Sequence, residues 1–314
     1  MLLLFPMKIS FIALALAWLL NPPGALQGQE PRLSYALQPG DVYLLEIDLQ
    51  QSTHSESMDR EEISFYTLTK LVFTVDSTDA AKDYHMRVQY QDLLLSMLAP
   101  QLNMDISSSS GKSPLLTRMM ELLEKESFHL SMSPAGELKN LEGLERFFKN
   151  LGEESGADSL ELEVVLNTLN EAFGPHAFSS LFEVFLWIYP VISPMNNWTN
   201  DITYYFNTKP VDLVNRYALS KASDELLVIQ GLGMLNASKE FLETTSMGEV
   251  KSTVSGSQTY DFQVDRKSGW PIRCVSRQRV LIETTILESN YFPTGLKIPS
   301  YTETVFEVKG SQVQ

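Results

Sequence analysis

Apolar and polar residues alternate with a period of two through most of the first third of this chain. From Gly40 to about Leu98 every second position is apolar over long stretches, as in the run from Tyr43 to Leu49. Such alternation is typical of antiparallel strands that pack on one face and meet water on the other. The polar stretch from Asp76 to Asp79 supplies a turn. The sequence therefore predicts a meander of antiparallel strands here.

The spacing becomes helical in the middle of the chain. Ser113 and Pro114 suit the N-cap and first position of a helix, and apolar residues follow at helical spacing to Leu123. Asp158 and Glu161 form a capping box for a second helix that ends at 174–175. Residues 178–189 are apolar most of the way round, which indicates a helix buried on more than one face.

Strand-like alternation resumes after Pro190. We predict strands over 198–206, 212–219, 226–231, 260–265, 270–281 and 297–309. Residues 231–233, Gly-Leu-Gly, are interpreted as a strand break or turn, and 266–269 as a four-residue hairpin loop. The buried face of the strand at 270–281 is ambiguous, because Arg273 shares a face with the apolar Val275 while Cys274 shares the other face with Ile272. A β-bulge would resolve this conflict.

These patterns predict an α+β fold that is predominantly antiparallel β. Two strand-rich halves, each a curved sheet, are expected to flank a helical middle. We predict a single strand-rich domain over 30–314 with a helical insertion at about 113–189. Segments 39–43 and 194–198 open the two halves similarly, so 30–135 and 190–314 form a possible pseudo-repeat.

The first 29 residues have the order of a secretory signal peptide. Lys8 precedes an apolar run over 9–20, then the helix-breaking segment 21–24 and a stretch of mostly small residues. The run is shorter than the roughly 20 residues that span a bilayer, no later run is long enough, and no cysteine marks a lipid attachment point. We expect a cleaved signal peptide at 1–29, a start at Met1 or Met7, and an exported protein, periplasmic or extracellular, without lipid anchor or membrane span.

The net charge of the chain bears on its binding partners, and its cysteine content bears on disulfide bonds. The chain has 24 Lys and Arg against 39 Asp and Glu. Loss of Lys8 with the signal leaves 23 minus 39, or −16, and an acidic surface repels phosphate backbones, so no nucleic-acid partner is expected. The single cysteine, Cys274, can form no internal disulfide and is interpreted as a buried strand residue.

The sequence contains no recognisable catalytic motif. The run Gly111-Lys112-Ser113 ends like a phosphate-binding loop, but the required earlier glycine is replaced by Ile106. The four histidines are far apart in sequence, so any metal site would have to be assembled by the fold. The sequence assigns no catalytic, cofactor-binding or metal residue, and no cofactor is predicted.

Several stretches together resemble a family of exported bacterial proteins known only as a domain of unknown function, DUF6263. They are 37–43, the turn 133–136 with 141–143, the segment 190–198 and the hairpin 260–269. The chain departs from the family pattern at Asn196 and Asn197, where the family has Gly-Asp. The resemblance implies export and a strand-dominated domain, and it implies no activity, substrate or site residue.

The function favoured by the sequence is non-enzymatic binding of an apolar ligand, such as a lipid, or of an envelope protein. The lining would come from the two apolar helices, through Met119, Met120, Phe178, Phe182, Phe185 and Trp187. A structural or interaction module of the cell envelope is the alternative, and a hydrolase acting through unidentified carboxylates is a third.

Overall fold

The computed structural model describes residues 32–55, 62–99, 104–107, 114–155, 159–191, 197–206, 209–236, 240–245, 248–288 and 293–313. Residues Leu33–Gln314 form one compact unit. The predicted signal peptide and the predicted caps Ser113 and Asp158 lie outside the described residues. In the described part, no helix has both the length and the apolar character needed to cross a membrane.

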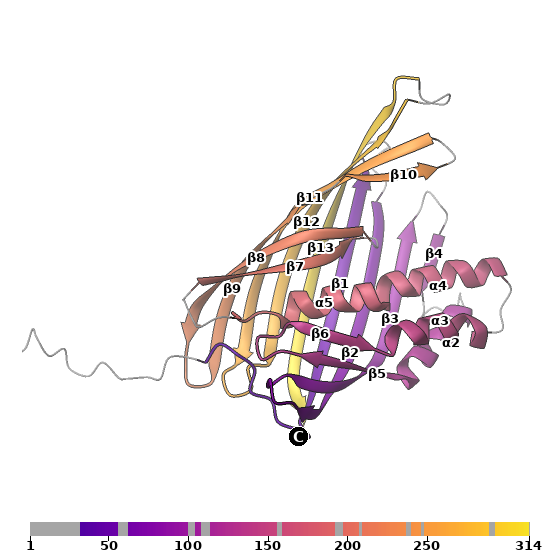
Figure 1. Cartoon of the computed structure of the whole chain (residues 1–314). Coiled ribbons are helices and arrows are strands. Elements are labelled where there is room, and N and C mark those ends of the chain that lie inside the picture. The colour runs from indigo at the N-terminus through magenta and orange to yellow at the C-terminus, as the bar shows by residue number, and fades with distance from the viewer. Residues whose placement is uncertain are drawn as a thin grey trace, which may run out of the picture. The chain divides into compact units, whose positions relative to one another are not determined.

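Within the described residues, thirteen strands form one antiparallel sheet (Figure 1). Its order is β6-β5-β3-β2-β1-β13-β12-β11-β9-β8-β7, with β4 paired to β3 and β10 paired to β11. In chain order the strands are β1 Val42–Ser55, β2 Glu62–Thr78, β3 Tyr84–Ala99, β4 Met104–Ser107, β5 Ser127–Met132, β6 Leu138–Glu142, β7 Asn197–Phe206, β8 Lys209–Ala222, β9 Leu226–Asn236, β10 Phe241–Thr245, β11 Gly248–Asp265, β12 Pro271–Ile286 and β13 Leu296–Val313.

The predicted α+β class with mostly antiparallel strands is confirmed, but the prediction of two separate sheets is wrong. Strand β1 pairs with β13 along its whole length, from Val42 opposite Val313 to Ser55 opposite Ser300. This pairing joins the N-terminal and C-terminal strands into one sheet. Local alternation indicates that strands exist but not which distant strand becomes the neighbour. The domain limits at 30–314 and the pseudo-repeat stay predictions.

The helices come from the segment between β6 and β7, apart from α2, which precedes β5. They are α2 Pro114–Lys125, α3 Leu144–Ser155, α4 Ser159–Phe173 and α5 Pro175–Leu186. In Figure 1, α4 and α5 cross one face of the sheet. We call this the inner face and the opposite one the outer face. Helix α3 was not predicted from the sequence.

The inner face and the helices share one hydrophobic core, in which aromatic rings form the contacts. Trp270 stacks on Tyr43 with ring centroids 4.7 Å apart, and its other ring neighbours include Phe73 at 5.3 Å. The Tyr189 hydroxyl donates to the Gly269 carbonyl at 2.8 Å. Each large apolar side chain buried in this way contributes roughly 1.5–3 kcal/mol to folding.

Strand β9 passes unbroken through the two glycines that the sequence analysis interpreted as a strand break. A Cβ on Gly231 would lie 2.7 Å from the Tyr217 ring and 2.9 Å from the Tyr260 ring. A Cβ on Gly233 would lie 2.5 Å from the Asn215 side chain. The glycines therefore make room for large side chains of neighbouring strands, and this contact is invisible in the sequence.

The predicted bulge in β12 is confirmed. Gln263 pairs with Arg273 and Val264 with Pro271, so Ile272 is the extra residue and is 40% exposed. Beyond the bulge, Cys274 and Val280 face the core, whereas Arg277 and Arg279 lie on the outer face. The predicted hairpin loop at 266–269 is also confirmed, with Gly269 at a φ of +77°.

A candidate binding groove on the outer face of the sheet

The six residues predicted to line an apolar ligand lie against the inner face. Met119, Met120, Phe178, Phe182 and Phe185 are at most 3% exposed. Their neighbours fill the space between them: Phe178 lies 4.9 Å from Phe128 and Phe185 lies 5.3 Å from Phe306, measured between ring centroids.

Trp187 differs from the other five because it is only partly buried. Its indole N–H makes no hydrogen bond to any described residue. The structure thus places all six residues in or beside a packed core. Their role as the lining of a ligand site stays a prediction.

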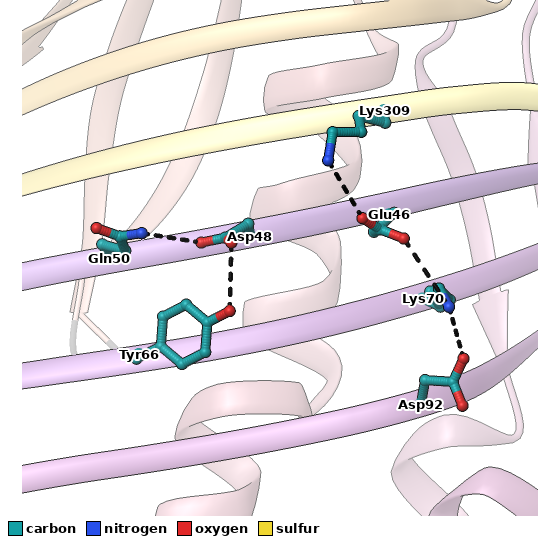
Figure 2. A network of polar contacts seen from close by, with 7 residues as sticks. All are labelled: Glu46, Asp48, Gln50, Tyr66, Lys70, Asp92 and Lys309. Atoms are coloured by element: carbon teal, nitrogen blue, oxygen red, sulfur yellow. Dashed lines mark hydrogen bonds and ion pairs between the residues drawn. The ribbon is translucent and has the colours of Figure 1, made fainter.

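The outer face carries a row of charged side chains across four neighbouring strands (Figure 2). Lys309 of β13 lies 3.6 Å from Glu46 of β1, which lies 3.9 Å from Lys70 of β2. Lys70 in turn donates to Asp92 of β3 at 2.7 Å. Each charge in this row thus faces an opposite charge, so the row as a whole presents no net charge to a ligand.

A second set of polar contacts lies further along β1. The Tyr66 hydroxyl and the Gln50 amide both donate to the Asp48 carboxylate, at 3.2 Å and 3.4 Å (Figure 2). Burial, followed by the neighbouring Asp48 charge, raises the pKa of Tyr66. The phenol is therefore a neutral donor at physiological pH, and the Asp48 carboxylate holds both side chains in place.

Beyond Asp48 the outer face is hollowed into a groove of about 430 Å³. Cross-strand register explains its composition, because eight lining residues form two complete rows over β13, β1, β2 and β3. The rows are Val305-Gln50-Tyr66-Ser96 and Glu303-Ser52-Ser64-Leu98. Gln51 and Phe65, whose side chains belong to the inner face, complete the lining.

Side-chain size explains why the surface is hollow there. Ser52, Ser64 and Ser96 are short and lie among longer side chains of both rows, including Tyr66 and Leu98. Side chains on one face of a sheet stand side by side, so a cluster of short ones leaves a depression. The three serine hydroxyls make no hydrogen bond to described residues, and they remain available to a ligand.

Two arginines of β12 flank the groove. Arg277 lies opposite Val305 and Arg279 lies opposite Glu303. Arg279 forms an ion pair with Glu303 at 3.1 Å, whereas Arg277 is exposed and forms no ion pair with described residues. Arg277 therefore adds free donors at one end of the groove.

Two further grooves lie among the described residues. One of about 520 Å³ crosses β7, β8 and β9 at the edge of the sheet, and its Gln230 amide already donates to Asp261 at 3.1 Å. Another of about 280 Å³ contains His85 and His129, two of the four histidines. No three His, Cys, Asp or Glu side chains gather as metal ligands in the part of the chain that the structure describes.

The groove over β13, β1, β2 and β3 offers hydrogen bonding and apolar contact. Glu303 is the single carboxylate among its described lining residues, and it is paired with Arg279. Acid and base hydrolysis of a glycoside uses two facing carboxylates, so the groove lacks the groups for that reaction. It has the size of a ligand site, since such sites are usually about 300–1,000 Å³.

Sequence reasoning missed this groove. Most of its residues lie on the faces of the predicted strands that the sequence analysis expected to meet water. The serine, glutamine and tyrosine residues between 50 and 66 were a sequence signal for a polar surface. The residues of β13 that complete the two rows come from the other end of the chain.

Two solved structures show weak similarity to this chain. Pseudomonas aeruginosa OpdQ covers 88% of this chain and 100% of its own at 6% identity, with a TM-score of 0.20. The COG4313 outer membrane channel from Pseudomonas putida F1 covers 90% and 99% at 7% identity, with a TM-score of 0.21. Similarity this low indicates neither a shared fold nor a shared function.

No curated protein matches the sequence. A family model matches residues 81–271, which is more than half of the chain and includes most of the strands and all of the described helices. The resemblance noted from the sequence is thereby confirmed. This chain belongs to DUF6263, a family of unknown function.

Proposed function

We propose that this is an exported, non-enzymatic protein that binds a component of the cell envelope through the groove over β13, β1, β2 and β3. The observation that carries the proposal is the groove of about 430 Å³ with its two complete rows of side chains. Export is supported by the order of residues 1–29. The filled inner core supports a site on the outer face instead of one among the helices.

The groove combines the features expected of a binding surface. Its polar groups point away from the core, and Asp48 fixes two of them, Tyr66 and Gln50. A side chain held in place before binding loses less conformational entropy when a ligand arrives. Tyr66 and the 48% exposed Leu98 add apolar area beside the free hydroxyls.

The test measures how the purified mature protein binds to an envelope fraction from the organism that makes it. Ser64→Gln fills the hollow with a side chain that stays polar, and we expect it to weaken co-sedimentation at least about tenfold, since a misfitting group in a ligand site costs 1–3 kcal/mol. Ser255→Gln makes the same change on the exposed outer face of β11 and should leave binding unchanged.

Folding of both variants is checked by circular dichroism and thermal unfolding. Absence of envelope binding by the unaltered protein would contradict the proposal. So would loss of binding in Thr199→Gln, within the edge groove, with Ser64→Gln unaffected.

A further inference from the structure

We infer that the groove binds an uncharged saccharide chain. This inference rests on the proposed function and names the class of its ligand. It follows from the hydrogen-bonding groups of the groove, from the absence of a free strand edge beside it, and from the pairing of its charges.

The hydrogen-bonding groups match a partner that is both donor and acceptor at many points. Ser52, Ser64 and Ser96 each offer one donor and an acceptor, and Gln50 offers an amide with both. Saccharide hydroxyls have the same dual character. The groups lie on adjacent strands about 4.8 Å apart, so they form a row across the sheet that an extended chain can follow.

Apolar contact is available beside these groups. The Tyr66 ring lies between Gln50 and Ser96 in its row, and Leu98 and Val305 stand at the β3 and β13 ends of the groove. The C–H faces of a sugar ring are apolar, and an aromatic side chain supplies a large contact area with few rotatable bonds. One aromatic ring and two aliphatic side chains thus complement a chain of polar rings.

A peptide is a poorer match for the same surface. Extended peptides commonly bind by adding a strand to an open sheet edge, but β13, β1, β2 and β3 are each hydrogen-bonded on both sides. Protein interfaces are also depleted in serine and glutamate, and the two rows of this groove contain three serines and a glutamate.

The charges around the groove disfavour a polyanion. Arg279 is paired with Glu303, and the row from Lys309 to Asp92 is paired internally. Arg277 is the single flanking cation without an ion pair to described residues, and it can donate to neutral oxygens. The acidic chain as a whole repels polyanions.

The experiment uses the mature protein and the envelope fraction after three separate treatments: periodate, which cleaves vicinal diols of sugars, protease, and no treatment. We expect periodate to abolish co-sedimentation and protease to leave it intact. We also expect Tyr66→Ala to reduce binding to the untreated fraction at least about fivefold, because the variant loses the aromatic contact with the faces of the sugar rings. Raising the salt to about 1 M, where the Debye length is about 3 Å, should change binding less than twofold.

Loss of binding after protease but not after periodate would overturn the saccharide inference and leave the proposed function intact. Loss of binding at high salt would also overturn it, because it would indicate a charged ligand. Failure of the untreated fraction to bind would instead reject the proposed function itself.

Discussion

At the scale of single residues, the inner face contains buried donors that differ in whether they have a partner. The Tyr260 hydroxyl donates to Asn215 at 2.8 Å, whereas the Tyr217 hydroxyl and the Asn215 amide nitrogen make no hydrogen bond to described residues. All three groups lie on the inner face of β8 and β11. Two tyrosines in contact, with ring centroids 5.8 Å apart, therefore offer a matched comparison.

We predict opposite effects of removing the two hydroxyls. Tyr217→Phe removes a buried group that has no partner, so stability should stay level or rise by about 1 kcal/mol. Tyr260→Phe leaves the Asn215 carbonyl unbonded in the core and should cost about 1–3 kcal/mol. Urea unfolding followed by tryptophan fluorescence measures both. A loss of 2 kcal/mol or so in Tyr217→Phe would show that this hydroxyl has a partner.

At the scale of elements, helix α5 carries a carboxylate in an unfavourable place. Glu183 is partly buried, and burial, with a smaller contribution from the Glu137 charge, raises its pKa to about 7. In the unfolded chain its pKa returns to about 4.5, the ordinary value for the group. The folded state thus binds the proton more tightly, so stability falls as the pH rises from about 4.5 to about 7 and is level above that.

We predict that Glu183→Gln raises the free energy of unfolding at pH 8, by about 1–2 kcal/mol after allowance for solvent screening at this partly exposed site. At pH 4 the variant and the original protein should be equally stable, because Glu183 is then protonated in both states. Urea unfolding at a series of pH values measures the difference. Glu171→Gln on the exposed side of α4 is the control, and an equal gain there would rule out a specific role of Glu183.

Elements with strong local patterns could be predicted, and elements that depend on distant partners could not. The alternation around Tyr43 predicts β1, and Pro114 marks the first residue of α2. Helix α3 also could have been predicted, because Leu144, Phe147, Phe148 and Leu151 recur at helical spacing, although the sequence analysis did not use this pattern. The groove was missed because Ser52 and Glu303 become neighbours only through the pairing of β1 with β13.

At the scale of the whole molecule, the single cysteine lies in the middle of the sheet, on the strand next to the pairing of β13 with β1. Cys274 on β12 pairs with Phe262 of β11 and with Val308 of β13, and it is fully buried on the inner face. Burial raises the pKa of its thiol. The thiolate is the reactive form, so both access and ionisation oppose modification of the folded protein.

We predict that Ellman's reagent labels Cys274 only when the sheet and the helices separate. The labelled fraction in increasing urea should follow the same transition as tryptophan fluorescence, because a core residue exchanges through global opening and not through local fraying. Thr259→Cys in a Cys274→Ala background places a thiol on the exposed outer face of β11 and should react at once without denaturant. Rapid labelling of Cys274 in native buffer would contradict the prediction, and it would mean that the helices leave the inner face while the sheet stays folded.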